Sequence, residues 1–512
     1  MIARLRIPGA RRRWLAVGAI AVVALTGCSV NGGAGQQQGS TLRVVAAAEP
    51  PSMNPVQSSS SDARVWGPIF DSLVKNDPAT GQVTKDGLLT GWQQQGKDWT
   101  FTVRQGVSFT NGEKFDATAA AFAIDQCRTD PAAIVGAWCG NIANAKTQGA
   151  DLVVETKLVY NDLPKLLTMI YAIPPQQYAS AGKAFSRAPV GTGPYKVLSY
   201  TPGSSLKLER NDSWWGGKPL LAGIDFSWAA DPSTRASYVA TGQADVALDL
   251  TPEAAATLKS KSGSGTTIES SPIDSFMILV MMTDKPPFDN VVLRQAVAHA
   301  IDKQAIVKAL FPNGGADRLD SLFKDLLNDP KSYNPEPPAY DPAEAKRLVA
   351  QLGGTPEITL SYTTNRAPKD AQLGEAVAGM LEKAGIQVRT NPLDYAKYRE
   401  QQVAKGMEIY IGPLLNIYRS VDVPSLGMLS PKGVTQNCSN PEYLEAREKG
   451  LAATSPAEQD RVFSDLDHRV FTDDVCDVPL IRYDGTYGLS TRVKGWQVPL
   501  NLVPDYTQVS VG

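Results

Sequence analysis

The sequence predicts a mixed α/β protein, and three patterns support this. Residues 99–104 alternate between apolar and polar side chains, as a half-buried strand does, and Asn111-Gly112 follows as a strong hairpin turn. A helix begins after Asp341, which can act as its N-cap, with Pro342 at the first helical position. Residues 368–389 read as a helix, a terminating glycine and a strand. Alternating helices and strands are typical of an α/β lobe.

The remaining elements are predicted in chain order. Residues 42–46 form a strand that runs into a proline-stiffened loop. Asp116 caps a helix that continues to about Arg128, and residues 195–200 form a strand followed by a turn at 201–204. Further predictions are a long apolar strand over residues 275–282, a single helix over residues 290–310 capped by Asp289, and a capping box closed by Glu344.

The N-terminus has the features of an export signal. Basic residues precede an apolar segment, residues 14–26, which is shorter than the about 20 residues needed to span a bilayer. Leu25-Thr26-Gly27-Cys28 matches a bacterial lipobox, so we expect residues 1–28 to be a lipoprotein signal peptide and Cys28 to carry acyl chains. Residues 29–40 form a flexible tether with a reach of roughly 20 Å. The sequence leaves Sec and twin-arginine export both open.

The composition and the cysteines narrow the class of protein. A net charge of −2 gives no sign of nucleic-acid binding. Cys127, Cys139, Cys438 and Cys476 remain in an oxidising compartment and allow three pairings. We favour Cys127–Cys139 and Cys438–Cys476, because each pair lies within one predicted structural unit. No pattern indicates a metal or a cofactor.

An enzyme is the class with least support. The two histidines, His299 and His468, lie in predicted helices and have no nucleophile motif beside them. The sequence contains no Gly-x-Ser-x-Gly, His-Glu-x-x-His or Walker pattern.

The most specific stretch is residues 189–219. Gly191-Thr192-Gly193 could open a phosphate loop, but Pro194 follows at once and a strand pattern replaces the required helix. The glycines therefore predict a sharp turn that leads into a hairpin. This stretch, with its later Trp214-Trp215 pair, resembles the signature of family 5 extracellular solute-binding proteins, the receptors of peptide and nickel ABC importers. Four further blocks resemble the same family in the same order, at residues 49–55, 99–124, 286–302 and 437–451.

The resemblance implies a two-lobe periplasmic-binding-protein-like fold of cluster C with an extra inserted subdomain. The implied domain I comprises residues 41–60, 188–272 and 478–512. The implied domain II is the insertion, residues 61–187, and domain III is the second lobe, residues 273–477. The ligand would be enclosed between the lobes by hinge closure.

The resemblance also suggests ligand-binding residues. An arginine after a strand of the second lobe binds the peptide carboxylate in dipeptide-binding members, and Arg366 occupies about that position; a surface arginine is an equal alternative. The amine-binding aspartate of those members corresponds most closely to Asn416, which is neutral and weakens the case for a free-amine ligand. Asp422 lies where the family often has its Asp-Pro, so a structural role is the alternative for this residue. The segment lacks the histidine of nickel-binding members.

The other candidate ligand-binding residues are one glutamate, the hydroxyl groups of a serine-rich loop, and aromatic side chains that could line the cleft. Serines in the first ligand-facing loop suit hydrogen bonds to a backbone or a sugar, although a serine run is more often a solvated loop. Aromatic side chains could line the cleft or belong to the core. This set comprises Glu49, Ser59, Ser60, Ser61, Trp66, Phe276, Tyr418 and Tyr483.

We therefore expect a solute-binding lipoprotein of an ABC importer. It would be a monomer on the outer face of the cytoplasmic membrane, with a permease and an ATPase as partners and a peptide or related polar oligomer as ligand. Membrane attachment would be through the N-terminal lipid, and no nucleic acid or cofactor is expected. The alternative is an envelope lipoprotein of the same fold that acts as a regulator or scaffold.

Overall fold

The computed structural model describes residues 40–58, 62–78, 80–261, 265–333, 336–364, 368–416, 418–430, 433, 436–438 and 440–512. The predicted lipidation site Cys28, the serines at 59–61 and Arg366 lie outside these described residues.

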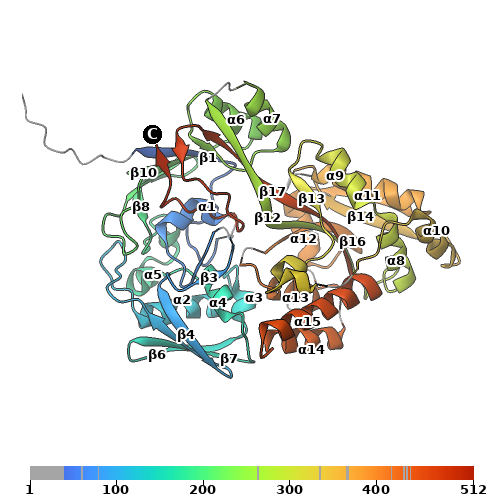
Figure 1. The fold of residues 1–512 in the computed structure, drawn as a ribbon, viewed down its shortest axis with the longest axis horizontal. Coiled ribbons are helices and arrows are strands. Elements are labelled where there is room, and N and C mark those ends of the chain that lie inside the picture. Colours follow the sequence, from blue (N-terminus) through green and yellow to red (C-terminus); the bar gives the residue numbers. More distant parts are fainter. Residues whose placement is uncertain are drawn as a thin grey trace, which may run out of the picture. The chain divides into compact units, whose positions relative to one another are not determined.

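One mixed sheet forms the centre of the fold (Figure 1). Its strands lie in the order β15-β14-β16-β12-β17-β11-β1-β10-β9-β8, and β13 adds to β17. Both parallel and antiparallel pairs occur, so the predicted mixed α/β class is confirmed. The strands are β1 Thr41–Ala46, β8 Tyr195–Thr201, β9 Ser205–Arg210, β10 Gly223–Trp228, β11 Val246–Ala247, β12 Thr266–Met281, β13 Ala316–Arg318, β14 Glu357–Thr363, β15 Gln387–Leu393, β16 Ile409–Leu415 and β17 Asp477–Ser490.

Strands β12 and β17 are long and belong to both lobes. The early part of β12 and the late part of β17 pair with each other beside β11, whereas the late part of β12 pairs with β16. Their mutual register shifts between Pro272 and Phe276 and again between Met277 and Ile278. The chain thus passes between the lobes within these two strands. Figure 1 shows both strands crossing the middle of the fold.

The second lobe surrounds its strands with helices. Side-chain caps begin several of them, as predicted for Asp341, whose carboxylate accepts from the backbone N–H groups of Ala343 and Glu344. Glu344 does not close a capping box; it pairs with Arg347. The helices are α8 Val291–Ala300, α9 Lys303–Leu310, α10 Pro342–Ala350, α11 Asp370–Lys383, α12 Tyr395–Val403, α13 Asp422–Leu429, α14 Pro441–Leu451 and α15 Pro456–His468, with a π-helical turn at Arg469–Asp473.

The single helix predicted over residues 290–310 is wrong. The chain leaves the helical conformation at Ile301, and Asp302 begins α9 by accepting a hydrogen bond from the N–H of Ala305. The cap of α8 is Asn290, not Asp289. Apolar spacing continues through the break, which explains why periodicity alone did not locate it.

The inserted subdomain is a four-stranded antiparallel sheet, β4-β5-β7-β6, against which α2 packs. Asp116 caps α2 as predicted. The segment after β7 returns to the first lobe, where the Leu73 N–H donates to the carbonyl of Ile170. The elements are β4 Leu89–Gln95, β5 Asp98–Val103, α2 Ala117–Thr129, α3 Gly136–Cys139, β6 Ile142–Gln148, β7 Asp151–Thr156, α4 Leu163–Leu166 and α5 Pro175–Ala181.

Short elements complete the described chain. They are β2 Lys75–Asn76, β3 Val83–Thr84, β18 Val493–Lys494, β19 Ser510–Val511, the helices α1 Ala63–Trp66, α6 Pro232–Ala240 and α7 Pro252–Lys261, and 3-10 turns at Gly67–Ile69, Leu167–Met169, Gly182–Ser186, Lys324–Leu326 and Pro330–Ser332.

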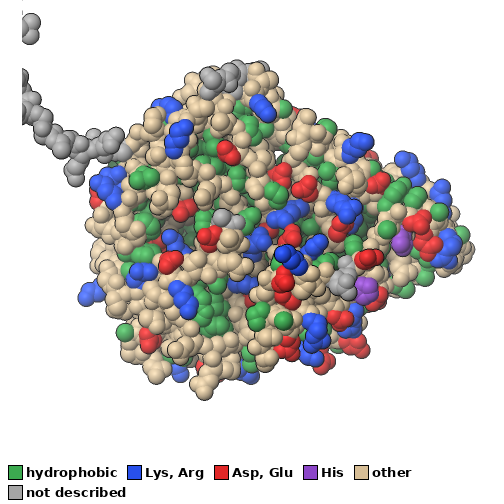
Figure 2. All heavy atoms as spheres, in the orientation of Figure 1, with side chains coloured by type: hydrophobic (Ala, Val, Ile, Leu, Met, Phe, Trp, Pro, Cys, Tyr) green, Lys and Arg blue, Asp and Glu red, His purple; other side chains and the backbone are tan. Residues whose placement is uncertain are grey.

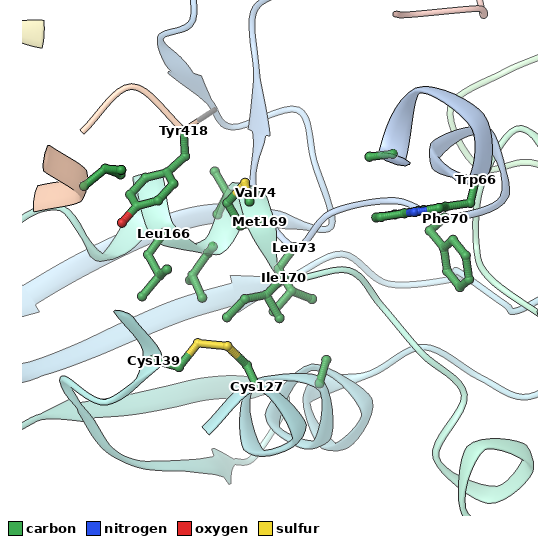
Figure 3. Packing of buried hydrophobic residues seen from close by; sticks show 14 of the residues in the cluster. Trp66, Phe70, Leu73, Val74, Cys127, Cys139, Leu166, Met169, Ile170 and Tyr418 are labelled. Atoms are coloured by element: carbon green, nitrogen blue, oxygen red, sulfur yellow. A yellow bond between two sulfur atoms is a disulfide. The ribbon is translucent and has the colours of Figure 1, made fainter. Parts of the chain in front are cut away.

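The structure contains both favoured disulfides. Cys127–Cys139 joins α2 to α3, and Cys438–Cys476 joins the segment before α14 to the residue before β17. Figure 3 shows the first bridge beneath the packed side chains of Leu166, Met169 and Ile170.

The glycines of the signature stretch allow a close backbone approach. A Cβ at Gly191 would lie 2.1 Å from the Ile69 carbonyl oxygen, and one at Gly193 would lie 2.5 Å from the Ile69 carbonyl carbon. Between them, Thr192 donates a hydrogen bond to Asp71, which also accepts from the indole N–H groups of the tryptophan pair. The stretch is therefore a packing element of the first lobe, as the turn prediction required.

Candidate ligand site between the lobes

Four charged side chains meet where β12 and β17 cross between the lobes. Asp274 on β12 accepts from Arg482 of β17 at 3.1 Å and from Arg419 of the loop after β16 at 2.5 Å. Arg482 also pairs with Asp325 at 2.7 Å, and Arg419 donates to the Asp325 carbonyl at 2.9 Å. We call these four residues the arginine clamp. Figure 2 shows basic and acidic side chains intermixed over this part of the face.

The members of the clamp differ in exposure. The side chain of Asp274 is 1% exposed and those of the two arginines 15–16%, whereas that of Asp325 is 50% exposed. Burial raises the pKa of Asp274 although two guanidinium groups oppose the shift. The Arg482 guanidinium lies 6.0 Å from the centre of the Phe276 ring, which places an aromatic face beside the charges.

The two lobes contact each other at the clamp and at the first turn of α7 in the first lobe. Gly81, between β2 and β3, approaches Arg419 so closely that a Cβ there would lie 2.0 Å from the arginine Cδ. On the other side, Lys369 pairs with Glu253 of α7 at 2.6 Å. Gly315 passes close to Pro252, also at α7. Contacts on both sides of the crossing strands therefore hold the lobes together.

A polar interlobe contact lies beside the inserted subdomain. The Tyr160 hydroxyl donates to Asp422 at 2.7 Å, and the Ser420 hydroxyl donates to Asp162. The Asn161 N–H donates to the Leu451 carbonyl at 3.0 Å, and its amide donates to the Ala453 carbonyl.

The interlobe contact contains a buried ion pair, between Asp422 at 0% exposure and Arg447 at 3%. Burial, then the charge of Asp422, raises the pKa of the Tyr160 hydroxyl well above its ordinary value. The tyrosine therefore stays a donor to this carboxylate at physiological pH.

The cavities among the described residues include two that lie away from the clamp. One of about 290 Å³ is bounded by Asp71, Lys75 and Trp214 in the first lobe. The other, of about 870 Å³, lies on the second lobe beside α15, next to Asp460 and His468. No clamp residue lines either cavity.

Comparison with known proteins identifies the family. Residues 84–436 match the model of the bacterial extracellular solute-binding proteins, family 5 Middle. The chain belongs to family 5 of the extracellular solute-binding proteins. The glutathione-binding protein GsiB of Salmonella paratyphi A is 29% identical over 351 residues, which cover 67% of this chain and 66%, just under two thirds, of that relative.

Solved structures show the same fold. NikA from Brucella suis, in complex with Fe(III)-EDTA, superposes with a TM-score of 0.79 at 22% identity, covering 92% of this chain and 100% of that one. The periplasmic binding protein DppA from Helicobacter pylori, in complex with peptide STSA, gives 0.78 at 19% identity, covering 93% and 98%. The two-lobe fold implied by the sequence is thereby confirmed. A family 5 protein is a binding protein and not an enzyme.

Within this solute-binding protein, one predicted ligand residue lies beside the clamp. Phe276 of β12 is next to Arg482, although it is only 3% exposed. Tyr483 follows Arg482 on β17, but it is 6% exposed, packs edge-on against Phe311 in the core of the second lobe and donates its hydroxyl to the Pro368 carbonyl at 2.9 Å. The sequence analysis named none of the four clamp residues.

Three further predicted ligand residues make contacts within the protein. Trp66 is 1% exposed, donates to Ser58 and packs edge-on against Phe70 and Tyr171, so it belongs to the core and not to a cleft wall. The Glu49 carboxylate accepts from Tyr200 and from the Gly203 N–H of the β8–β9 hairpin. Asn416 is 0% exposed and bonds to the backbone of Ser420.

Tyr418 and Asp422 belong to the closed lobe boundary. The Tyr418 ring is 4% exposed and packs edge-on against Trp138, and Figure 3 shows it beside Leu166 of the inserted subdomain. The Asp422 carboxylate accepts hydrogen bonds from Tyr160 and Arg447. In this structure the polar residues of that loop join the lobes to each other.

The described residues contain no group of three or more His, Cys, Asp or Glu side chains placed to hold a metal ion. None of the described helices is long and apolar enough to cross a membrane.

Proposed function

We propose that the protein is the solute-binding lipoprotein of an ABC importer, which captures a peptide or related polar oligomer between its lobes and delivers it to a permease driven by an ATPase. The observation that carries the proposal is the family 5 fold with charged and aromatic side chains gathered where the lobes meet. A site between domains with a few oriented polar groups is typical of small-ligand binding. The protein would act as a monomer.

A peptide-like ligand has support from the relatives. The curated relatives that match include glutathione-binding proteins, and the structural neighbours include a protein in complex with a peptide. We propose Arg366 as a ligand-binding arginine, because it follows strand β14 of the second lobe, as the carboxylate-binding arginine does in the family resemblance. Ser59, Ser60 and Ser61 remain proposed hydrogen-bonding residues of the first-lobe loop.

Arg366→Ala is expected to weaken peptide binding by about 2–5 kcal/mol, because a buried carboxylate would lose its charged partner. Isothermal titration calorimetry with a panel of host-derived peptides measures the change. Arg347→Ala is the matched control, since Arg347 pairs with Glu344 on the exposed face of α10. Equal losses in both variants would contradict the role of Arg366, and absence of binding across the whole panel would favour the regulator alternative.

We propose that Cys28 anchors the protein to the outer face of the cytoplasmic membrane. Cys28→Ala is expected to release the protein or leave it unprocessed, because one or more acyl chains would be lost from the N-terminus. Detergent-phase partitioning of the two forms measures this. Membrane association that is identical with and without Cys28 would overturn the lipoprotein assignment.

A further inference from the structure

The arginine clamp contains one fixed carboxylate and one exchangeable carboxylate. Both oxygens of Asp274 are used, Oδ1 by Arg482 and Oδ2 by Arg419, and its side chain is almost fully buried. Asp274 therefore holds the two guanidinium groups in a fixed relative position. Asp325 lies in a short 3-10 turn, is half exposed, and contributes a single side-chain contact to the clamp, to Nη1 of Arg482.

The charges of the clamp cancel only while Asp325 is in place. Two arginines face two aspartates, so withdrawal of the Asp325 carboxylate would leave one uncompensated positive charge. The donor that loses its partner would be Nη1 of Arg482, since its Nε is already bonded to the Ile273 carbonyl at 2.9 Å and its Nη2 to Asp274. An arginine oriented in this way matches a carboxylate.

We propose that the clamp is a carboxylate-binding subsite of the interlobe site and that Asp325 occupies it in the absence of solute. The preferred solute then carries an acidic group that replaces the Asp325 carboxylate on Arg482, in addition to any terminal carboxylate bound by Arg366. This assignment rests on the proposed function for the delivery of a solute, but the anion-binding chemistry of the clamp does not depend on the solute being a peptide. Gly81 of the first lobe contacts the Arg419 side chain, so the clamp lies at the boundary between the lobes.

The first test measures the subsite with acetate alone. The melting temperature of Asp325→Ala is followed as acetate replaces chloride at constant ionic strength. We expect a rise on the order of 1 °C or more, since a ligand that binds the folded state stabilises it. The wild type, Asp325→Ala/Arg482→Lys and the control Glu344→Ala, which loses an exposed acid on α10, are expected to show no such rise. An equal response in all four proteins overturns the proposal.

The second test uses matched peptides that differ only by Glu or Gln at one position. Asp325→Ala is expected to bind the Glu peptide at least several-fold tighter than the wild type does and the Gln peptide equally well, and Arg482→Lys is expected to lose the preference. If the Glu and Gln peptides bind equally well, with or without Arg482, the proposed subsite is wrong but the proposed function is unaffected. If no peptide binds but acetate stabilises Asp325→Ala, the subsite is supported and the peptide assignment fails.

Discussion

Arg447→Leu is expected to lower the free energy of unfolding by about 3–5 kcal/mol, because it leaves the Asp422 carboxylate buried without a cation. Asp422 is 0% exposed, and its other described partner is the Tyr160 hydroxyl, which cannot neutralise it. This loss is a large fraction of the free energy of unfolding of a typical protein, which is about 5–15 kcal/mol. Urea denaturation of the wild type and the variant measures it.

Two further variants separate the ion pair from simple packing. Arg447→Leu/Asp422→Leu is expected to recover most of the loss, since replacing both charges removes the uncompensated carboxylate. Arg347→Leu, which breaks an exposed pair on α10, is expected to cost no more than about 1 kcal/mol. Should Arg447→Leu behave like Arg347→Leu, the interlobe contact would be hydrated in solution and of little energetic weight.

Removal of the Cys438–Cys476 disulfide with a pair of serines is expected to cost about 4 kcal/mol. Its cysteines are 38 residues apart, so the bridge limits the unfolded chain more than Cys127–Cys139 does, which closes 12 residues and should contribute about 3 kcal/mol. Denaturant unfolding of both serine pairs under oxidising conditions measures the two effects. The reverse order would show that native packing around the sulfurs, and not loop length, determines the stabilisation.

The sequence alone predicted the start of a helix correctly where the capping residue is a recognisable side chain. Asp116 and Asp341 cap helices in the structure as the sequence predicted, because a side-chain oxygen at that position satisfies free N–H groups within three residues. The break at Ile301 was not predicted because the same apolar face continues on both sides of it, and the sequence analysis did not identify Asp302 as the cap of a second helix.

The site depended on contacts that no local pattern records. Asp274 meets Arg419 and Arg482 across 145 and 208 residues of sequence. Asn416 and Asp422 were predicted as ligand contacts because they are polar residues in the segment that resembles the family's amine-binding segment. In the structure their side chains form hydrogen bonds with other groups of the protein. The available signal for the clamp was a charged residue at the end of an apolar run, Arg482 after residues 478–481 and Asp274 shortly before residues 276–282.

The irregular pairing of β12 with β17 has a mechanical consequence. Regular ladder pairing stops at Pro272 with Asp484 and resumes at Phe276 with Arg482, and Asp274 lies in this gap. A pair of strands bends most easily where its ladder hydrogen bonds are missing, so we expect the lobes to pivot at this gap. The Asp274–Arg482 pair spans that pivot. An anion held there would stiffen the joint itself, where a small change of angle produces the largest displacement at the distant rims of the lobes.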